Sequence, residues 1–373
     1  MSLAHHLALQ TLPGIGDVRT KMLIEHFNSA ENLFRNIKDL QTENLPGLQS
    51  LMKQLKDSTV QSLLLSKAEK ELEFCEKHKI DAIPFTDPRY PELLRTCPDG
   101  PSLLFSKGEI NWDNQRFLAV VGTRKATAYG KAFCEHLVST LKPYRPIIVS
   151  GLAHGIDCAI HKACIDQGVS TIAVLGHGLD RIYPAAHRGM AAKILQNGGL
   201  ISDFWSGTAT RPENFPKRNR IVAGMCEATI IVEAAIKGGA MVTAQLAQSY
   251  QREIYAVPGK INDPYSTGCN HLIKTQKANL LDLPEELPME LGWEPFNLEK
   301  KFKQSSLLQG VEAEKQRKIL RLLDEKKRLH LDSLCDHLQL SGSDMLTELL
   351  QLELLDKIKS EPGDYYMLKP AFA

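Results

Sequence analysis

The chain has 373 residues, of which 43% are hydrophobic and 24% are charged, and its formal net charge is +1. This length predicts two or three domains, and this composition is typical of a globular protein that buries an apolar core of its own. It contains no run of about 18 apolar residues and no secretory signal pattern, so we expect no membrane contact, and the near-zero charge means that binding to a polyanion would require locally concentrated basic residues.

Residues 1–75 have a helical pattern and form the first predicted domain. The turn at residues 12–15 (LPGI) stands between two helical stretches, and its Leu-Pro-Gly recurs at residues 45–47. A glycine-rich turn before a helix can present backbone N–H groups to a phosphate. In this respect the segment resembles the SAM-like and helix-hairpin-helix modules of DNA-handling proteins. A helical packing domain whose turn simply needs glycine remains the alternative.

Between residues 81 and 282, short apolar runs alternate with helical stretches. Continuous apolar strands separated by helices indicate a mostly parallel sheet that is covered on both faces. We therefore predict that residues 81–282 form a doubly wound α/β domain. The predicted strands lie at 117–121, 146–149, 171–175, 228–232 and 253–257.

Residues 283–309 are rich in Pro, Glu, Lys and Gln and are predicted to form a linker. In residues 310–373, three helices and a terminal hairpin predict a winged helix. Its third helix, 343–355, carries Asp344, Glu348 and Glu353 and no Lys or Arg. Because carboxylates that face phosphates oppose binding, we expect this domain to contact protein or its own chain rather than to read duplex DNA.

Several predicted strands end in glycine-rich or small-residue turns. Ligands bind open α/β sheets at the carboxyl ends of the strands, and a glycine turn or a helix N-terminus there suits an anion. The sequence therefore predicts a phosphate-binding edge. No G-x-G-x-x-G follows the first strand and no Walker lysine motif is present, which argues against NAD binding and ATP hydrolysis. The turns lie at 121–124, 150–153, 175–178 and 257–260, with a fifth segment at 237–244.

The segment 211–220, RPENFPKRNR, supplies the local concentration of positive charge that a protein of near-zero net charge would need to bind a polyanion. It holds four basic residues against the single acidic Glu213, and Phe215 lies among them. Cations that meet phosphates beside a ring that stacks on a base are typical of a site for single-stranded nucleic acid. A solvated basic loop is the alternative, and the anion-suited turns on the same sheet edge favour the binding interpretation.

The sequence argues against a metal site and against catalysis. His154, Cys158, His161 and Cys164 have the ligand types of a zinc site, but one helix cannot bring four ligands together tetrahedrally. The eight cysteines are dispersed and form no C-x-x-C pair, which indicates reduced thiols in a cytoplasmic protein. Because G-x-S-x-G and H-E-x-x-H are both absent, we expect neither an enzyme nor a cofactor.

Seven stretches resemble, in order, the signature sequences of the DNA-processing protein A (DprA/Smf) family, and they cover nearly all of residues 81–282. They include VVGTRKATAYG at 120–130, SGLAHGIDCAIHKACI at 150–165 and FPKRNRIVAG at 215–224. The resemblance implies a Rossmann-like domain that binds single-stranded DNA non-specifically and forms a homodimer. It also implies an interaction with the RecA recombinase, which the protein would help to load in natural transformation.

The family motifs also imply which residues bind DNA. Basic side chains would contact phosphates, Phe215 would meet a base or shape the pocket, and the glycine turns would allow close backbone approach. The family usually has a Ser-Gly-Ser type of sequence where this chain has Lys237 to Ala240, so hydroxyl donors are missing there. The implied residues are Gly122, Thr123, Arg124, Ser150, Gly151, Phe215, Lys217, Arg218 and Arg220. Secondary candidates are Arg211, Gly238, Gly239, Thr243 and Lys260.

Two other classes of function are weaker alternatives. One is an enzyme that acts on a nucleotide or nucleoside phosphate, because the core resembles the lysine-decarboxylase-like nucleotide hydrolases. Their P-G-G-x-G-T sequence is only partly echoed at residues 237–243. The other is a sequence-specific transcription regulator that uses the winged helix, which the acidic third helix disfavours.

Overall fold

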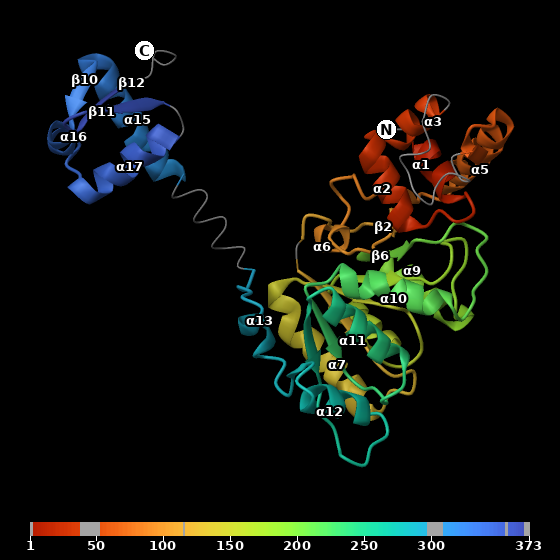
Figure 1. Cartoon of the computed structure of the whole chain (residues 1–373). Helices are drawn as coiled ribbons and strands as arrows, with labels where there is room; N and C mark the ends of the chain where they lie inside the picture. Colours follow the sequence, from red (N-terminus) through yellow and green to blue (C-terminus); the bar gives the residue numbers. More distant parts are fainter. Residues whose placement is uncertain (1–2, 38–52, 115, 297–308, 355–356, 369–373) are drawn as a thin grey trace. The chain divides into compact units, whose positions relative to one another are not determined.

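The computed structural model describes residues 3–37, 53–114, 116–296, 309–354 and 357–368. The chain divides into two compact units, Met1–Pro295 and Phe296–Ala373, which are described separately (Figure 1). Within the described ranges, no helix is long and apolar enough to cross a membrane.

The first unit begins with a helical module. Ser29 and Asp57 cap two of its helices, because their side chains accept hydrogen bonds from Asn32 N and Thr59 N. The first Leu-Pro-Gly turn lies between two helices, as predicted, whereas its second copy at 45–47 lies outside the described residues. The described helices of this module are α1 (Leu3–Gln10), α2 (Asp17–Phe27), α3 (Ala30–Asn36) and α5 (Ser58–Lys77).

The module packs against a nine-stranded sheet in the same unit. The strand order is β1-β2-β6-β5-β4-β3-β7-β8-β9, and all neighbours from β6 to β9 are parallel, whereas β1 and β2 pair antiparallel at one edge. The predicted mostly parallel, Rossmann-like sheet is therefore confirmed. The strands are β1 (Asp81–Pro84), β2 (Leu103–Gly108), β3 (Phe117–Val121), β4 (Ile147–Ser150), β5 (Thr171–Val174), β6 (Gly198–Ser202), β7 (Ala228–Ile231), β8 (Glu253–Ala256) and β9 (Asn279–Leu280).

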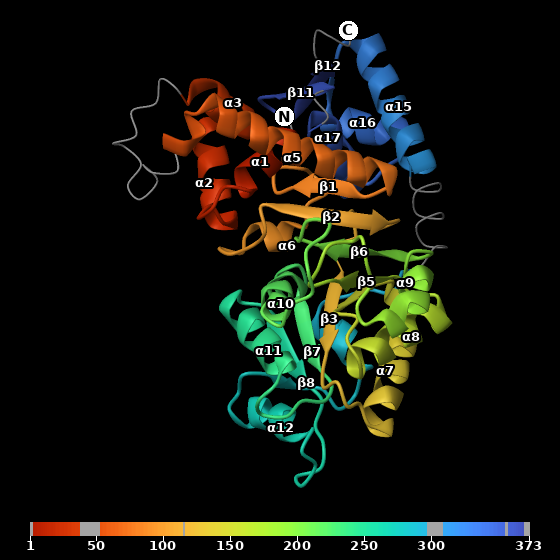
Figure 2. The same ribbon diagram turned by 90° about the vertical axis from the view of Figure 1, so that its right-hand side faces the viewer.

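Helices cover both faces of this sheet, as Figure 2 shows. Successive side chains of a strand point to opposite faces. In β3, Leu118 and Val120 pack in one core with α7 and α8, whereas Phe117 and Ala119 belong to the other core with α10 and α11. The helices are α6 (Glu92–Arg95), α7 (Ala128–Leu141), α8 (Ile156–Gln167), α9 (Arg188–Ile194), α10 (Asn214–Gly224), α11 (Gly239–Ser249), α12 (Thr267–Lys274) and α13 (Leu287–Glu290).

The order of the strands reverses at β3. From β3 the chain passes to β4, β5 and β6 on one side, and it then returns to place β7 on the other side of β3. The connections after β3 and β7 diverge at such a point, and open α/β sheets bind their ligands in the crevice between them.

The first part of the predicted linker, 283–309, belongs to the compact α/β domain. Residues 283–295 belong to the first unit, where Leu287 and Trp293 are buried in the α/β core and Trp293 Nε1 donates a hydrogen bond to Glu227. The α/β domain thus extends beyond residue 282. Residues 297–308 lie outside the described part of the chain.

The second unit is a winged helix, as predicted. A three-stranded sheet in the order β10-β12-β11 covers a core that includes Ile319, Leu334 and Met345. The second unit contains α15 (Gln309–Lys326), β10 (Arg328–His330), α16 (Leu331–Leu338), α17 (Gly342–Leu354), β11 (Ile358–Glu361) and β12 (Tyr365–Leu368).

The argument that the carboxylates of the third helix, α17, would face the phosphates of DNA is wrong in detail. Glu348 is buried and accepts a hydrogen bond from Gln316, and Glu353 accepts hydrogen bonds from the backbone and side chain of Ser360. These two carboxylates are held within the domain. The exposed part of α17 includes the third carboxylate, Asp344, together with Leu346 and Leu350, which have 47% and 58% of their surfaces accessible.

Candidate functional site

A pocket of about 350 Å³ opens at the carboxyl ends of β3, β4 and β7, where the strand order reverses. The loops after these three strands, α10 and the start of α11 form most of its wall. The lining residues are Val121, Gly122, Thr123, Arg124, Lys125, Gly151, Ala153, Asp157, Phe215, Arg218, Asn219, Val222, Ala234, Ala235, Lys237, Gly238, Gly239, Ala240, Thr243 and Tyr265.

The pocket brings together most of the predicted binding residues from four separate segments. Lys125 and Lys237, which were not predicted to bind, also line it. Both stand beside the glycine turns, and this was the signal in the sequence that could have identified them. The predicted residues in the lining are Gly122, Thr123, Arg124, Gly151, Phe215, Arg218, Gly238, Gly239 and Thr243.

Arg124 and Phe215 form the outer wall of the pocket. The guanidinium carbon of Arg124 lies 5.6 Å from the centre of the Phe215 ring, within the range of a cation–π contact. Thr123 N donates to Glu233 O at 2.6 Å, and this hydrogen bond ties the Arg124 loop to the end of β7. Arg124 is exposed, so its charge is available to a ligand.

Arg218 places a second positive charge deep in the pocket. Only 5% of its surface is exposed, and its Nη1 donates to Val174 O at 2.6 Å. Asp157 is buried nearby and accepts a hydrogen bond from Ala153 N. Burial lowers the pKa of Arg218 and raises the pKa of Asp157, while attraction between the two groups opposes both shifts. The pair thus keeps a desolvated guanidinium at the pocket.

Two of the predicted glycines are needed to build the pocket itself. A Cβ at Gly151 would lie 2.0 Å from Arg218 Nη1, and a Cβ at Gly122 would lie 2.5 Å from the Ile156 side chain. Gly239 differs, because a Cβ there meets nothing within 4 Å. Gly239 opens α11, whose first N–H groups have no acceptor within the helix and therefore suit an anion.

The remaining predicted residues do not line this pocket. Ser150 is buried and donates to Val120 O at 2.6 Å. Lys217 is exposed on α10, and Arg211 and Lys260 are exposed on loops. Because residues 214–224 form a helix, successive side chains turn by about 100° and the basic residues of this segment point in different directions. The phosphate contacts of Lys217, Arg211 and Lys260 stay predictions.

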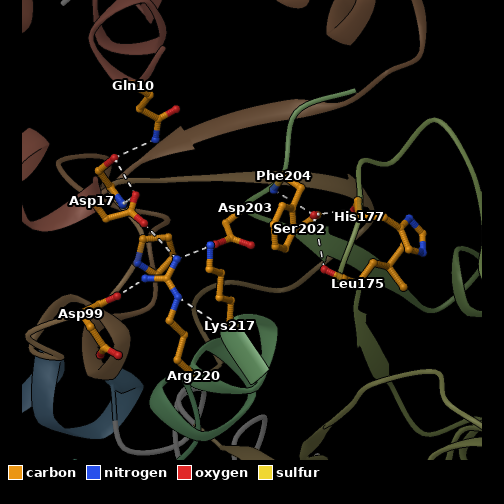
Figure 3. Close-up of polar contacts among 12 residues, drawn as sticks. Gln10, Asp17, Asp99, Leu175, His177, Ser202, Asp203, Phe204, Lys217 and Arg220 are labelled. Carbon is orange, nitrogen blue, oxygen red and sulfur yellow. Dashed lines mark hydrogen bonds and ion pairs between the residues drawn. The ribbon is translucent and has the colours of Figure 1, made fainter. Parts of the chain in front are cut away.

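The assignment of Arg220 to phosphate is wrong. Its guanidinium forms ion pairs with Asp17 at 2.9 Å and Asp203 at 2.5 Å, and it donates to Asp99 O (Figure 3). Burial opposes the charged form of Arg220, but Asp203 and Asp17 hold its pKa above the ordinary value. Arg220 therefore joins the helical module to the α/β domain instead of facing a ligand.

The structure also favours a packing role for the glycine-rich turn before α2. Asp17 lies in the first turn of this helix and accepts hydrogen bonds from Ser102 N and Ser102 Oγ, in addition to its ion pair with Arg220. The start of α2 thus faces the α/β domain, where its own carboxylate interacts with neighbouring groups.

The residues of the zinc-like pattern have separate surroundings. His161 is buried against Thr171, its Nδ1 lying 2.8 Å from Thr171 Oγ1, whereas the ring of His154 packs on His187. Cys158 contacts Met190. Within the described part of the chain, no three His, Cys, Asp or Glu side chains form a group that could hold a metal ion.

Comparison with known protein families identifies both units. The family described as DNA recombination-mediator protein A matches residues 81–292, and the DprA winged helix domain matches residues 308–364. Protein Smf of Escherichia coli K12 is 37% identical over 294 residues, which is 78% of each chain. Protein Smf of Synechocystis is 29% identical over 398 residues, covering 97% of this chain and 98% of the relative.

Two solved structures share the fold. DNA processing protein A from Streptococcus pneumoniae has a TM-score of 0.64 and 30% identity, and the match covers 79% of this chain and 99% of that one. DNA processing protein A from Helicobacter pylori has a TM-score of 0.53 and 27% identity, covering 58% of this chain and 98% of that one. The description of the Helicobacter structure assigns that protein a single-stranded DNA binding mode.

Proposed function

Because this chain belongs to the DprA/Smf family of DNA recombination-mediator proteins, we propose that it binds single-stranded DNA non-specifically through the pocket at β3, β4 and β7. In this proposal the protein protects the strand and helps to load the RecA recombinase in natural transformation or homologous recombination. It acts in the cytoplasm as a homodimer through its α/β domain, without a cofactor and without catalysis.

The observation that carries this proposal is the chemistry of the pocket wall. Arg124, Lys125 and Lys237 line the same pocket as the start of α11, and Phe215 also lines it, next to Arg124. Cations and helix N–H groups attract phosphates whatever the sequence, and an aromatic ring stacks on any base. Such a set of groups suits a single strand, whose bases are free to stack.

The relatives support the same function. Single-stranded DNA binding is attributed to the Helicobacter protein, and this chain shares its fold over 98% of that protein. RecA loading and dimer formation follow from the family resemblance of the motifs at 120–130, 150–165 and 215–224.

An enzyme acting on a nucleotide phosphate is the competing proposal. The carboxylates near the pocket have structural partners: Glu233 accepts hydrogen bonds from Thr127 N and Thr127 Oγ1, and Asp157 lies beside Arg218. These contacts favour binding over a reaction in which one of these carboxylates serves as a free acid or base.

Competition binding separates the two proposals. Fluorescence anisotropy with labelled oligo-dT should give saturable binding that unlabelled single strands displace, whereas matching duplex and mononucleotides should displace it weakly. A protein that bound and hydrolysed mononucleotides but not oligo-dT would refute single-strand binding in favour of the enzyme.

A further inference from the structure

Tyr183 lies beside Phe215 although it comes from a different loop. The two ring centres are 6.2 Å apart, with 42° between the ring planes. Tyr183 keeps 52% of its surface exposed, so its ring is accessible to a ligand. Phe215 thus contacts two planar groups, the guanidinium of Arg124 and the ring of Tyr183.

The backbone of Tyr183 is held in place by a buried histidine. His177 is 1% exposed, its Nε2 accepts a hydrogen bond from Tyr183 N at 3.3 Å, and its Nδ1 lies 2.9 Å from Gly178 O. The His177 carbonyl in turn accepts a hydrogen bond from Ser202 Oγ at 2.7 Å, at the end of β6 (Figure 3). A backbone held in this way loses little conformational freedom when the ring binds a base.

We propose that Tyr183 is a second base-stacking position, which extends the path of the strand from the pocket across the loop after β5. This inference rests on the proposed single-strand binding. Stacked nucleotides rise by about 3.4 Å along one strand, and an extended strand spaces them further apart. Rings whose centres lie 6.2 Å apart can therefore receive neighbouring bases of one strand.

A second aromatic position also explains why an aromatic ring would be exposed at this edge. An isolated exposed tyrosine needs no explanation, but this one is next to a ring that lines a cationic pocket. Stacking does not depend on the base, so Tyr183 would strengthen binding without adding sequence preference.

The test compares oligo-dT with a strand of equal length and charge in which abasic residues replace the nucleotides. Tyr183→Ala should weaken oligo-dT binding by about 5- to 150-fold, the loss expected for one stacked base. Binding of the abasic strand should stay as in the wild type, because its phosphates are unchanged. Tyr183→Phe should bind oligo-dT like the wild type, because the ring is retained, and Tyr183→Leu should not.

The outcomes distinguish this inference from the function on which it rests. Equal losses on both strands, or wild-type binding of oligo-dT by Tyr183→Ala, would overturn the stacking role while leaving the pocket as the binding site. If the wild type failed to bind oligo-dT at all, the proposed function itself would fail. Thermal unfolding of each variant shows whether the fold is retained.

Discussion

Arg218 and Arg220 lie two residues apart on α10, and their side chains point to opposite sides of the helix. Arg218 lines the pocket, whereas Arg220 forms an ion pair with Asp17 of the helical module. A separation of two residues on a helix turns side chains by about 200°. The same helix therefore carries part of the candidate DNA site and part of the contact between the two portions of the first unit.

Replacing Arg220 should reduce stability strongly. Arg220→Ala leaves Asp203, which is largely buried, without its cation, and removing one partner of a buried pair costs about 3–5 kcal/mol. Urea unfolding of wild type and variant measures this loss. Asp17→Asn, at the more exposed end of the network, is the matched control and should cost less. A stable Arg220→Ala variant that had lost only its DNA affinity would show that Arg220 contacts the ligand after all.

A carboxylate introduced at the start of α11 should weaken DNA binding without lowering the stability of the protein. Gly239→Glu adds a Cβ that meets nothing within 4 Å, and it places a negative charge at a helix N-terminus, which favours the helix by about 0.3–1 kcal/mol. The same charge repels phosphates, so affinity for oligo-dT should fall at least about tenfold. Gly239→Gln controls for size and should keep most of the affinity. Unchanged binding by Gly239→Glu would exclude this helix start from the site.

Buried His161 should make the protein sensitive to acid. Burial, with smaller effects from Arg218 and His187, lowers its pKa to about 3, whereas an unfolded histidine titrates near about 6.5. Its contribution to stability is therefore present above about pH 6.5 and is lost as the pH falls, because only the unfolded chain takes up the proton. At pH 5.0 this effect should lower the free energy of unfolding by roughly 2 kcal/mol.

Urea unfolding at pH 7.5 and 5.0 tests this effect by comparison with His161→Gln, which cannot titrate. The variant should lose less stability on acidification than the wild type. His6, whose burial lowers its pKa to about 4, contributes in the same direction in both proteins. Asp157 and Asp203, whose pKa values burial raises, act in the opposite direction, and the comparison between the two proteins removes their common part. Parallel pH profiles would contradict the assignment to His161.

The winged helix should be dispensable for binding a single strand. The exposed part of α17 carries Leu346 and Leu350, and the pocket lies wholly in the first unit. A chain that ends at residue 296 should bind oligo-dT within about twofold of the full chain, as measured by anisotropy. If truncation abolished binding while the first unit stayed folded, the second unit would have to contact the strand.

The apolar runs predicted the central strands correctly because buried parallel strands are continuously hydrophobic. They did not predict β1, which contains Pro84, or β6, which begins with Gly198 and Gly199. The two-residue β9 is too short to give a pattern. The sequence therefore predicted the central strands and the turns that follow them, but not β1, β2, β6 or β9 and not the order of the strands.

The site was predicted in outline and misassigned in part for a geometric reason. The basic segment 211–220 looks continuous in sequence, but the helix beginning at Asn214 separates Arg218 from Lys217 and Arg220. Tyr183 was not predicted because its contact with Phe215 depends on the path of a loop that no local pattern reveals. Likewise, the burial of Glu348 in α17 depends on packing against Gln316, far away in the sequence.

The most direct test of the central claim is the salt dependence of oligo-dT binding by the wild type and by Arg124→Ala. Each phosphate contact contributes about −0.7 to the slope of log affinity against log salt concentration for a single strand. The variant should bind more weakly and with a slope about 0.7 less steep, whereas Lys193→Ala, an exposed lysine of α9 outside the pocket, should match the wild type. If Arg124→Ala kept the affinity and the slope of the wild type, the pocket at β3, β4 and β7 would not be the DNA site.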